Sequence, residues 1–236
     1  MAFEMHDECG IFGIILEHPA PCIIQYLYNG LFALQHRGQE SVGIAFTNAK
    51  RIEIYKKQGL VANRLFKIAS EEYKSLAGIG HVRYSTHGAS ILSNIQPIKV
   101  NCNKGEIAIA HNGNIPFAGQ IIRELIRSGS IFQTTCDSEI FLQLMARVPG
   151  IDFEKSLTSV LNQVVGAYSI LLLHRNRIIA IRDPHGFRPL SIGKVKKGYV
   201  FASESCAFEL KSKVGEIISI QGTLPSIMAM LIAFNF

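Results

Sequence analysis

The chain has 236 residues, of which 48% are apolar and 18% charged, and its formal net charge is +6 at pH 7. This length suits one domain with a substantial core, and the composition is globular, without the signature of a disordered chain. The lysines and arginines are scattered, and their densest run is residues 194–197, so the pattern argues against a nucleic-acid interface.

The N-terminus and the cysteines indicate the compartment. The first residues lack the basic and apolar regions of a secretory signal. The longest strongly apolar run, Ile227–Phe234, is far shorter than the roughly 20 residues that span a bilayer. Five cysteines at wide spacings, without a Cys-x-x-Cys pair, argue against a disulfide framework or a zinc ribbon. The sequence therefore predicts a cytoplasmic protein without a membrane segment.

The first predicted elements are a strand and a helix. A continuous apolar run over residues 10–16 indicates a buried strand. Residues 22–35 carry apolar side chains at helical spacing, and Gly38 follows as a stop signal. Within this helix, Asn29-Gly30 indicates a kink or a close helix contact. Short strands are predicted next at 42–46, 51–57, 77–85 and 106–111.

Helices and a last group of strands complete the pattern. Amphipathic helices are predicted over 121–129 and 138–148, and Asp137 stands where a cap or a ligand group would lie. Arg182-Asp183, followed by Pro184 and Gly186, could form a substrate contact, but the pattern favours a turn held by the Asp side chain and the proline. The last strands are predicted at 167–175, 177–184, 198–203 and 216–220. Many short strands with helices gathered between them indicate a one-domain α+β fold.

Cys9 stands between a polar octapeptide and the first apolar strand. A free cysteine in this position is most often a small buried hydrophobic residue. Four polar clusters favour a chemical role instead, because each places Arg, Asn or Asp beside a glycine or an element end. These clusters are LQHRGQES (34–41), GHVRYSTHG (80–88), AHNGN (110–114) and TTCDSE (134–139).

Together these residues meet the needs of a thiol that attacks a carboxamide. The tetrahedral oxyanion requires two donors, which the Asn112 side chain and the Gly113 N–H can supply. An α-amino acid also carries a carboxylate, which Arg83 can bind bidentately, and an ammonium group, which Asp137 can bind.

The base for this reaction is not evident among the histidines. A nucleophile can use its own α-amine when it is the first residue. A free α-amine has a pKa of about 7.7–8, so it is partly neutral near pH 7. Removal of residues 1–8 would give Cys9 such an amine.

The motifs CGIFGI, LQHRGQES, GIGHVRYSTHG, AHNGN, DSE and RDPHGFRPLSIG resemble the glutamine amidotransferase domain of the amidophosphoribosyltransferase family. Members of this family are glycosyltransferases that open de novo purine biosynthesis. The resemblance runs from about residue 6 to about residue 221. It implies an α+β fold, namely a four-layer αββα sandwich of the N-terminal-nucleophile hydrolase type. It divides the chain into a propeptide (1–8), an amidotransferase domain (9–221) and an atypical apolar tail (222–236).

The resemblance also implies roles for single residues. Cys9 matches the N-terminal nucleophile, and Asn112 and Gly113 match the oxyanion pair. Arg37 matches an arginine that supports the nucleophile without reacting. The implied glutamine contacts are Arg83, Tyr84, Thr86 and Asp137.

The implied reaction is hydrolysis of L-glutamine to glutamate and ammonia through a thioester. The family continues into a phosphoribosyltransferase domain, for which this sequence shows no counterpart, so transfer to phosphoribosyl pyrophosphate would need that half. No cofactor is implied in this chain: magnesium belongs to the other half, and an iron–sulfur cluster cannot be predicted. His81, His87 and His111 do not have the spacing of a zinc site.

Two alternatives stay open. The first is another amidotransferase of this class, such as the one that makes glucosamine 6-phosphate, although QHRGQES fits the purine enzyme better. The second is a non-catalytic remnant or binding module of the same fold, against which the complete set of site residues argues. The sequence leaves the oligomeric state open, with a homo-oligomer as one outcome.

Overall fold

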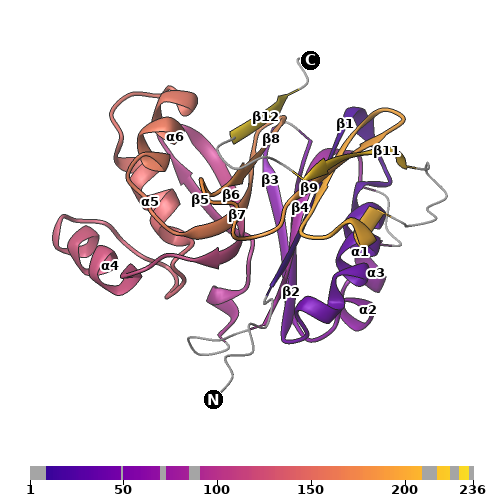
Figure 1. Cartoon of the computed structure of the whole chain (residues 1–236), viewed down its shortest axis with the longest axis horizontal. Helices are drawn as coiled ribbons and strands as arrows, with labels where there is room; N and C mark the ends of the chain where they lie inside the picture. Colours follow the sequence, from indigo (N-terminus) through magenta and orange to yellow (C-terminus); the bar gives the residue numbers. More distant parts are fainter. Residues whose placement is uncertain are drawn as a thin grey trace.

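Two antiparallel β-sheets pack face to face, and helices cover their outer faces (Figure 1). The computed structural model describes residues 9–48, 50–69, 73–84, 91–208, 217–223 and 229–233. Over these ranges, one sheet has seven strands in the order β11-β9-β10-β1-β4-β2-β3, and the other has five in the order β12-β8-β7-β6-β5. This arrangement confirms the predicted α+β sandwich with αββα layers.

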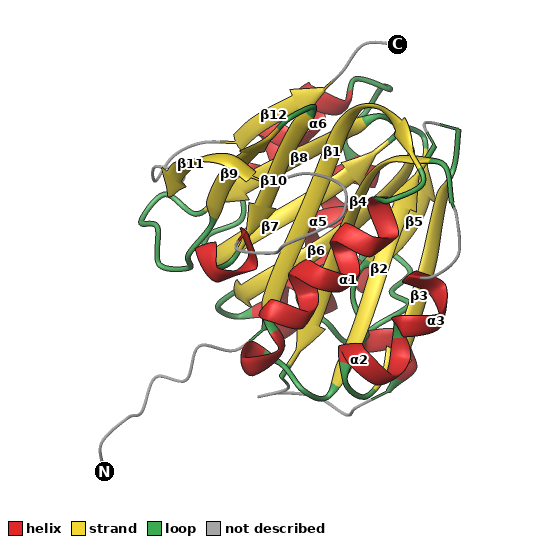
Figure 2. Cartoon of the chain, turned by 90° about the vertical axis from the view of Figure 1, so that its right-hand side faces the viewer, coloured by secondary structure: helices red, strands yellow, loops and turns green. Residues whose placement is uncertain are grey.

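The seven-stranded sheet has the N-terminal strand at its centre. β1 pairs with β4 on one side and with β10 on the other. The strands are β1 (Gly10–Ala20), β2 (Ser41–Thr47), β3 (Ile52–Gln58), β4 (Ser75–Arg83), β9 (Ser191–Val195), β10 (Gly198–Ala202) and β11 (Ile217–Thr223). Figure 2 shows α1 (Ile23–Ala33) lying across this sheet, beside the short helices α2 (Val61–Arg64) and α3 (Phe66–Ala69).

The five-stranded sheet carries the second helical layer. Its strands are β5 (Ile98–Cys102), β6 (Gly105–Asn114), β7 (Ala167–His174), β8 (Arg177–Arg182) and β12 (Ala229–Ala233). Its helices are α4 (Ala118–Arg127), α5 (Glu139–Arg147) and α6 (Phe153–Leu161). Short 3₁₀ helices span Gln35–Arg37, Leu92–Asn94 and Ser205–Phe208. Among the described residues, no helix has the length and apolarity needed to cross a membrane.

The core is divided into three apolar clusters, which match the layers. Alternation along β1 explains two of them: Ile11 and Ile15 face the other sheet, whereas Phe12 and Ile14 pack beneath α1. A third cluster lies between the five-stranded sheet and its helices. Because β1 is covered on both faces, its sequence is a continuous apolar run rather than an alternating one.

Gly30 explains how closely α1 approaches the sheet. A methyl group at this position would collide with the ring of Phe12. Of the two outcomes predicted for Asn29-Gly30, the structure therefore shows the close contact.

The C-terminal strands extend past the predicted domain boundary. β11 crosses residue 221, and β12 pairs antiparallel with β8 at the edge of the second sheet. Residues 229–233, which were expected in the apolar tail, thus form a strand. The predicted propeptide (1–8) lies outside the described residues.

Candidate active site

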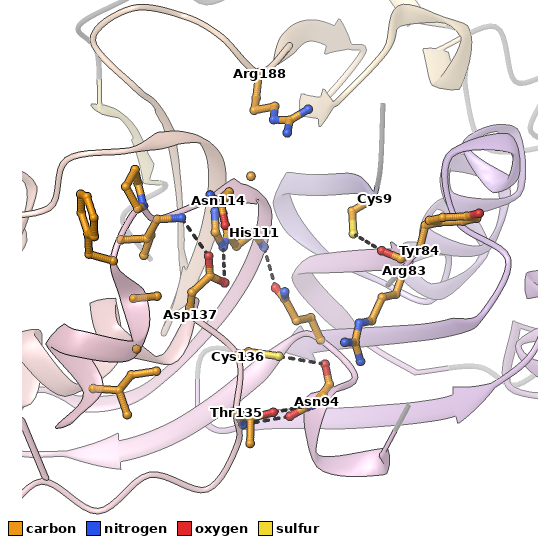
Figure 3. Close-up of a pocket in the computed structure, with 18 residues that line it drawn as sticks. Cys9, Arg83, Tyr84, Asn94, His111, Asn114, Thr135, Cys136, Asp137 and Arg188 are labelled. Atoms are coloured by element: carbon orange, nitrogen blue, oxygen red, sulfur yellow. Dashed lines mark hydrogen bonds and ion pairs between the residues drawn. The ribbon is translucent and has the colours of Figure 1, made fainter. Parts of the chain in front are cut away.

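A cavity of about 750 Å³ opens where strand ends of the two sheets meet. Cys9 precedes β1, Arg83 ends β4, Gly113 and Asn114 end β6, and Asp137 lies ahead of α5. Figure 3 shows Cys9 and Arg83 on one wall and Asp137 on the opposite wall. The fold therefore brings into one pocket most of the residues that the sequence singled out.

Cys9 is held at several points. Its Sγ donates to the Tyr84 carbonyl oxygen at 3.5 Å (Figure 3). Its backbone nitrogen donates to the Arg37 carbonyl oxygen at 3.0 Å, and Arg37 Nε donates to the Cys9 carbonyl oxygen at 2.8 Å. Its φ of 67° is uncommon outside glycine and shows that the local contacts dictate its conformation. These contacts fix the backbone of Cys9 against Arg37, while the nucleophile role of Cys9 and the supporting role of Arg37 stay predictions.

The proposed oxyanion pair stands at the end of β6. Gly113 lines the cavity with a φ of 154°, and a side chain there would collide with the Ala167 carbonyl oxygen, so this position requires glycine. Asn112 is fully buried behind this wall, and neither its Oδ1 nor its Nδ2 finds a partner among the described residues. A buried amide without a partner costs free energy, and such a group is often kept for a ligand.

Arg83 and Asp137 supply opposite charges to the pocket. Arg83 is buried at the end of β4. Asp137 Oδ2 accepts a hydrogen bond from the Ile115 backbone nitrogen at 3.0 Å, and its Oδ1 lies 3.6 Å from His111 Nδ1. Asp137 therefore does not cap α5. It faces the cavity, where a cation of a ligand can reach it (Figure 3).

A buried polar network holds His111 beneath the pocket. His111 Nδ1 is 2.8 Å from Ser138 Oγ, and its backbone nitrogen donates to Gln96 Oε1 at 2.7 Å. Gln96 Nε2 in turn donates to Ser138 Oγ at 3.0 Å. Burial lowers the pKa of His111; the Asp137 charge opposes this shift and the Arg188 charge adds to it. A neutral His111 thus fixes the strand end that carries Asn112.

His81 is a second buried histidine without the surroundings of a metal ligand. Its Nε2 lies 3.1 Å from the His111 carbonyl oxygen, and burial lowers its pKa to about 3. In the described part of the chain, the group with ligand-like spacing is instead His36, Glu204 and Cys206, whose ligand atoms lie within 4.8 Å. The Glu204 carboxylate is already paired with Arg37, so this group does not itself call for a metal.

Four more residues of the polar clusters can be placed or set aside. Tyr84 is half exposed and lines the cavity, whereas Thr86 and His87 lie outside the described residues. Cys136 also lines the cavity, and burial is the first cause that raises its pKa to about 11. The Cys136 thiol therefore stays protonated and does not compete as a nucleophile.

The turn after β8 brings in a residue that sequence reasoning missed. Asp183 accepts hydrogen bonds from the backbone nitrogens of Tyr168, His185 and Phe187 at 3.2, 2.9 and 3.1 Å, which confirms the predicted turn. This turn carries Arg188 to the cavity (Figure 3). The motif RDPHGFRPL contained the signal, but only the fold shows which of its arginines lines the pocket.

Comparison with known proteins gives consistent matches. Residues 81–209 match the family described as glutamine amidotransferase domain. The amidophosphoribosyltransferase of Methanocaldococcus jannaschii is 41% identical over 222 residues, which is 90% of this chain and 47% of that protein. That of Bacillus subtilis is 40% identical over 207 residues, which is 87% of this chain and 43% of that protein. The chain thus spans less than half the length of these relatives.

Two solved structures share the fold. One is described as the allosteric regulatory enzyme of purine biosynthesis; it has a TM-score of 0.79 and 38% identity, covering 90% of this chain and 45% of that one. The other is glutamine phosphoribosylpyrophosphate amidotransferase from B. subtilis, complexed with ADP and GMP. It has a TM-score of 0.78 and 35% identity, covering 96% of this chain and 49% of that one.

Proposed function

The chain belongs to the glutamine amidotransferase domain family, and from this membership we propose that it releases ammonia from L-glutamine through a thioester on Cys9. The observation that carries the proposal is the pocket that the Cys9 thiol lines together with the opposite charges of Arg83, on its own wall, and Asp137, on the opposite wall. A free α-amino acid needs both charges, whereas a simple amide needs neither.

Substrate binding follows from these charges. Arg83 pairs with the α-carboxylate, and Asp137 accepts from the α-ammonium group. The two contacts orient the side-chain carboxamide toward Cys9 Sγ. Holding the carbonyl carbon next to the thiol makes the attack effectively unimolecular, which is a large part of the rate that such a site can supply.

The chemistry uses the chain's own groups. After residues 1–8 are removed, the Cys9 amine takes the thiol proton as Sγ bonds to the carboxamide carbon. The oxyanion is bound by Asn112 Nδ2 and by the Gly113 N–H. Collapse of this intermediate breaks the C–N bond, and the amine returns the proton to the leaving ammonia. Water then hydrolyses the thioester, which yields glutamate and restores the thiol.

We propose that the whole protein is an amidophosphoribosyltransferase of de novo purine biosynthesis, with this chain as its glutaminase part. The identity of about two residues in five to such enzymes supports this proposal. Ammonia would pass to phosphoribosyl pyrophosphate in a further domain, which would also hold magnesium. The absence of a resident cofactor here and the cytoplasmic location stay predictions, and the oligomeric state stays open.

An ammonia-release assay tests the proposal. The purified protein, with its N-terminus determined by mass, is compared with Cys9→Ser and Cys136→Ser, because both cysteines line the same cavity. We expect glutamine-dependent ammonia release from the wild type and from Cys136→Ser, but not from Cys9→Ser. If a wild type that begins at Cys9 neither turns over nor is labelled by a glutamine-like electrophile, the non-catalytic alternative is correct.

A further inference from the structure

Glu204 lies on the far side of Arg37 from the nucleophile. Arg37 is buried, and while its Nε donates to the Cys9 carbonyl oxygen at 2.8 Å, its Nη1 donates to Glu204 Oε1. One guanidinium group therefore connects the backbone of Cys9 to a carboxylate from the other end of the sequence.

The residue before Glu204 fixes the same end of β1. The Ile11 backbone nitrogen donates to Ser203 Oγ at 3.0 Å, and the Ser203 backbone nitrogen donates to the Ile11 carbonyl oxygen at 3.0 Å. Ser203 is fully buried. Ser203 and Glu204 thus hold the nucleophile's strand at two points, one directly and one through Arg37.

The Glu204 carboxylate is oriented through both of its oxygens. Oε1 accepts from Arg37, and Oε2 lies 3.0 Å from His36 Nε2. The other ring nitrogen of His36 lies 3.1 Å from the Ala33 carbonyl oxygen, which fixes the ring. Desolvation acts to raise the pKa of Glu204, but Arg37 and His36 together hold it below its ordinary value. Glu204 is therefore an anion that neutralises the buried Arg37 charge.

We propose that Glu204 is a positioning residue for the nucleophile, which it holds through Arg37. The inference rests on the proposed function, because it concerns the thiol that the glutaminase reaction uses. Without the carboxylate, Arg37 loses the ion pair that orients its guanidinium group toward the Cys9 carbonyl. The amine and thiol of Cys9 are then misplaced relative to the glutamine carboxamide, whereas the contacts of Arg83 and Asp137 with glutamine stay in place.

Kinetics of Glu204→Gln provide the first test. We expect kcat to fall by about 10–100-fold, the scale of a small misplacement of reacting groups, while KM stays within about a factor of two. Glu53→Gln is the matched control, because Glu53 forms an ion pair at the surface, in which its Oε1 lies 3.3 Å from Arg51 Nη2. Glu204→Asp keeps the charge and should retain intermediate activity, and it replaces Glu204→Gln in every comparison if that variant does not fold. A folded Glu204→Gln with wild-type kcat would overturn the proposal.

A double-mutant cycle separates positioning from a general structural effect. If Glu204 acts through Arg37, Glu204→Gln should have little further effect in an Arg37→Met background. Equal effects of Glu204→Gln in both backgrounds would show that the two residues act independently and would overturn the proposal.

The same four proteins of the cycle, namely the wild type, Glu204→Gln, Arg37→Met and the double variant, are also compared in a second measurement. It is the rate at which iodoacetamide alkylates Cys9, followed by peptide mass spectrometry. This readout does not require turnover. A wild type without glutaminase activity would therefore refute the proposed function, while the alkylation rates of the four proteins would still decide whether Glu204 and Arg37 are coupled at Cys9.

Discussion

The backbone nitrogen of Cys9 lies 3.0 Å from the carbonyl oxygen of Arg37. This is the atom that becomes the α-amine once residues 1–8 are gone, so its acceptor is already in place. We expect the intact mass of the wild type to lack residues 1–8 and that of Cys9→Ala to retain them, because the thiol drives the cleavage. Equal masses after allowance for the substitution would show that Cys9 has no part in its own processing.

Asn112→Ala tests the oxyanion site. Loss of one oxyanion donor should lower kcat by about 10²–10³. The fold should persist, because the Asn112 amide makes no hydrogen bond to the described residues that the substitution could remove. Steady-state kinetics and the thermal midpoint measure the two effects, and activity within a few-fold of wild type would exclude Asn112 from this role.

Asn94→Ala is the matched control for that variant. Asn94 also belongs to the pocket, but its Nδ2 donates to Thr135 Oγ1 at 2.8 Å and its Oδ1 accepts from the Thr135 nitrogen at 3.0 Å. For Asn94→Ala we expect the free energy of unfolding to fall by about 1–3 kcal/mol, and kcat to fall less than in Asn112→Ala.

Asp137→Asn should weaken glutamine capture. The substitution keeps an oxygen for the Ile115 nitrogen but removes the charge that we propose binds the substrate ammonium group. A hydrogen bond to a charged group contributes about 1.5–3 kcal/mol, so KM should rise by about 10–100-fold with a smaller change in kcat. Asp152→Asn changes a carboxylate that caps α6 and should leave KM as it is. An unchanged KM for Asp137→Asn would contradict the assigned role.

The buried histidines predict a loss of stability in mild acid. Burial lowers the pKa of His81 from 6.5 to about 3, and the pKa values of His111 and His174 are lowered in the same direction. Between pH 6.5 and about 3, the unfolded chain binds a proton at His81 that the folded protein does not bind. The contribution of His81 to the free energy of unfolding is therefore complete above about pH 6.5 and is lost as the pH falls toward 3.

Urea unfolding measures this dependence. For His81 alone, the free energy of unfolding should fall by about 2 kcal/mol between about pH 7 and about pH 5. His81→Gln keeps a donor for the His111 carbonyl and cannot titrate in this range, so it should flatten the curve. The depressed carboxylates Glu106 and Glu204 add their loss only below about pH 4.5, which keeps the two windows apart. An equally steep curve for His81→Gln would contradict the assignment.

Gly30→Ala tests the close approach of α1 to the sheet. The added methyl group collides with the Phe12 ring, and overpacking of this kind costs about 1–3 kcal/mol. Gly119→Ala is the control in α4, where the added atom meets only the Arg123 side chain at 3.5 Å. That substitution should stabilise the protein by up to about 1 kcal/mol. Urea midpoints that move in the same direction would contradict this difference.

The sequence predicted β1 and β7, whose apolar runs are continuous, and it missed β5 and β9, whose composition is mixed. β1 and β7 are covered on both faces and read plainly as buried strands. β5 contains Lys99 and Asn101, and β9 contains Gly193 and Lys194, so neither has a clear periodicity. Their pairing with neighbours decides their structure, and a local pattern does not contain that information.

The residues of the site also differ in whether the sequence alone could predict them. Cys9, Arg83, Gly113 and Asp137 could be chosen from the sequence, because each residue type is needed by one reaction and stands at a strand end or ahead of a helix. Gln96, Ser138, Arg188 and Glu204 could not, because their partners lie far away along the chain. Asn112 was chosen for its chemistry, and only the fold shows that its amide is buried behind the pocket wall.

The contact between Ile11 and Ser203 spans 192 positions of the chain. During synthesis, Cys9 therefore leaves the ribosome long before the segment that fixes its strand exists. Contacts between distant positions also tend to form slowly, because the entropy of closing a long loop is lost before the contact is gained. We therefore expect the strand of Cys9 to be anchored only after the chain has been synthesised at least to Ser203. The proposed glutaminase activity would then appear only in a chain in which this contact between the two ends of the sequence has formed.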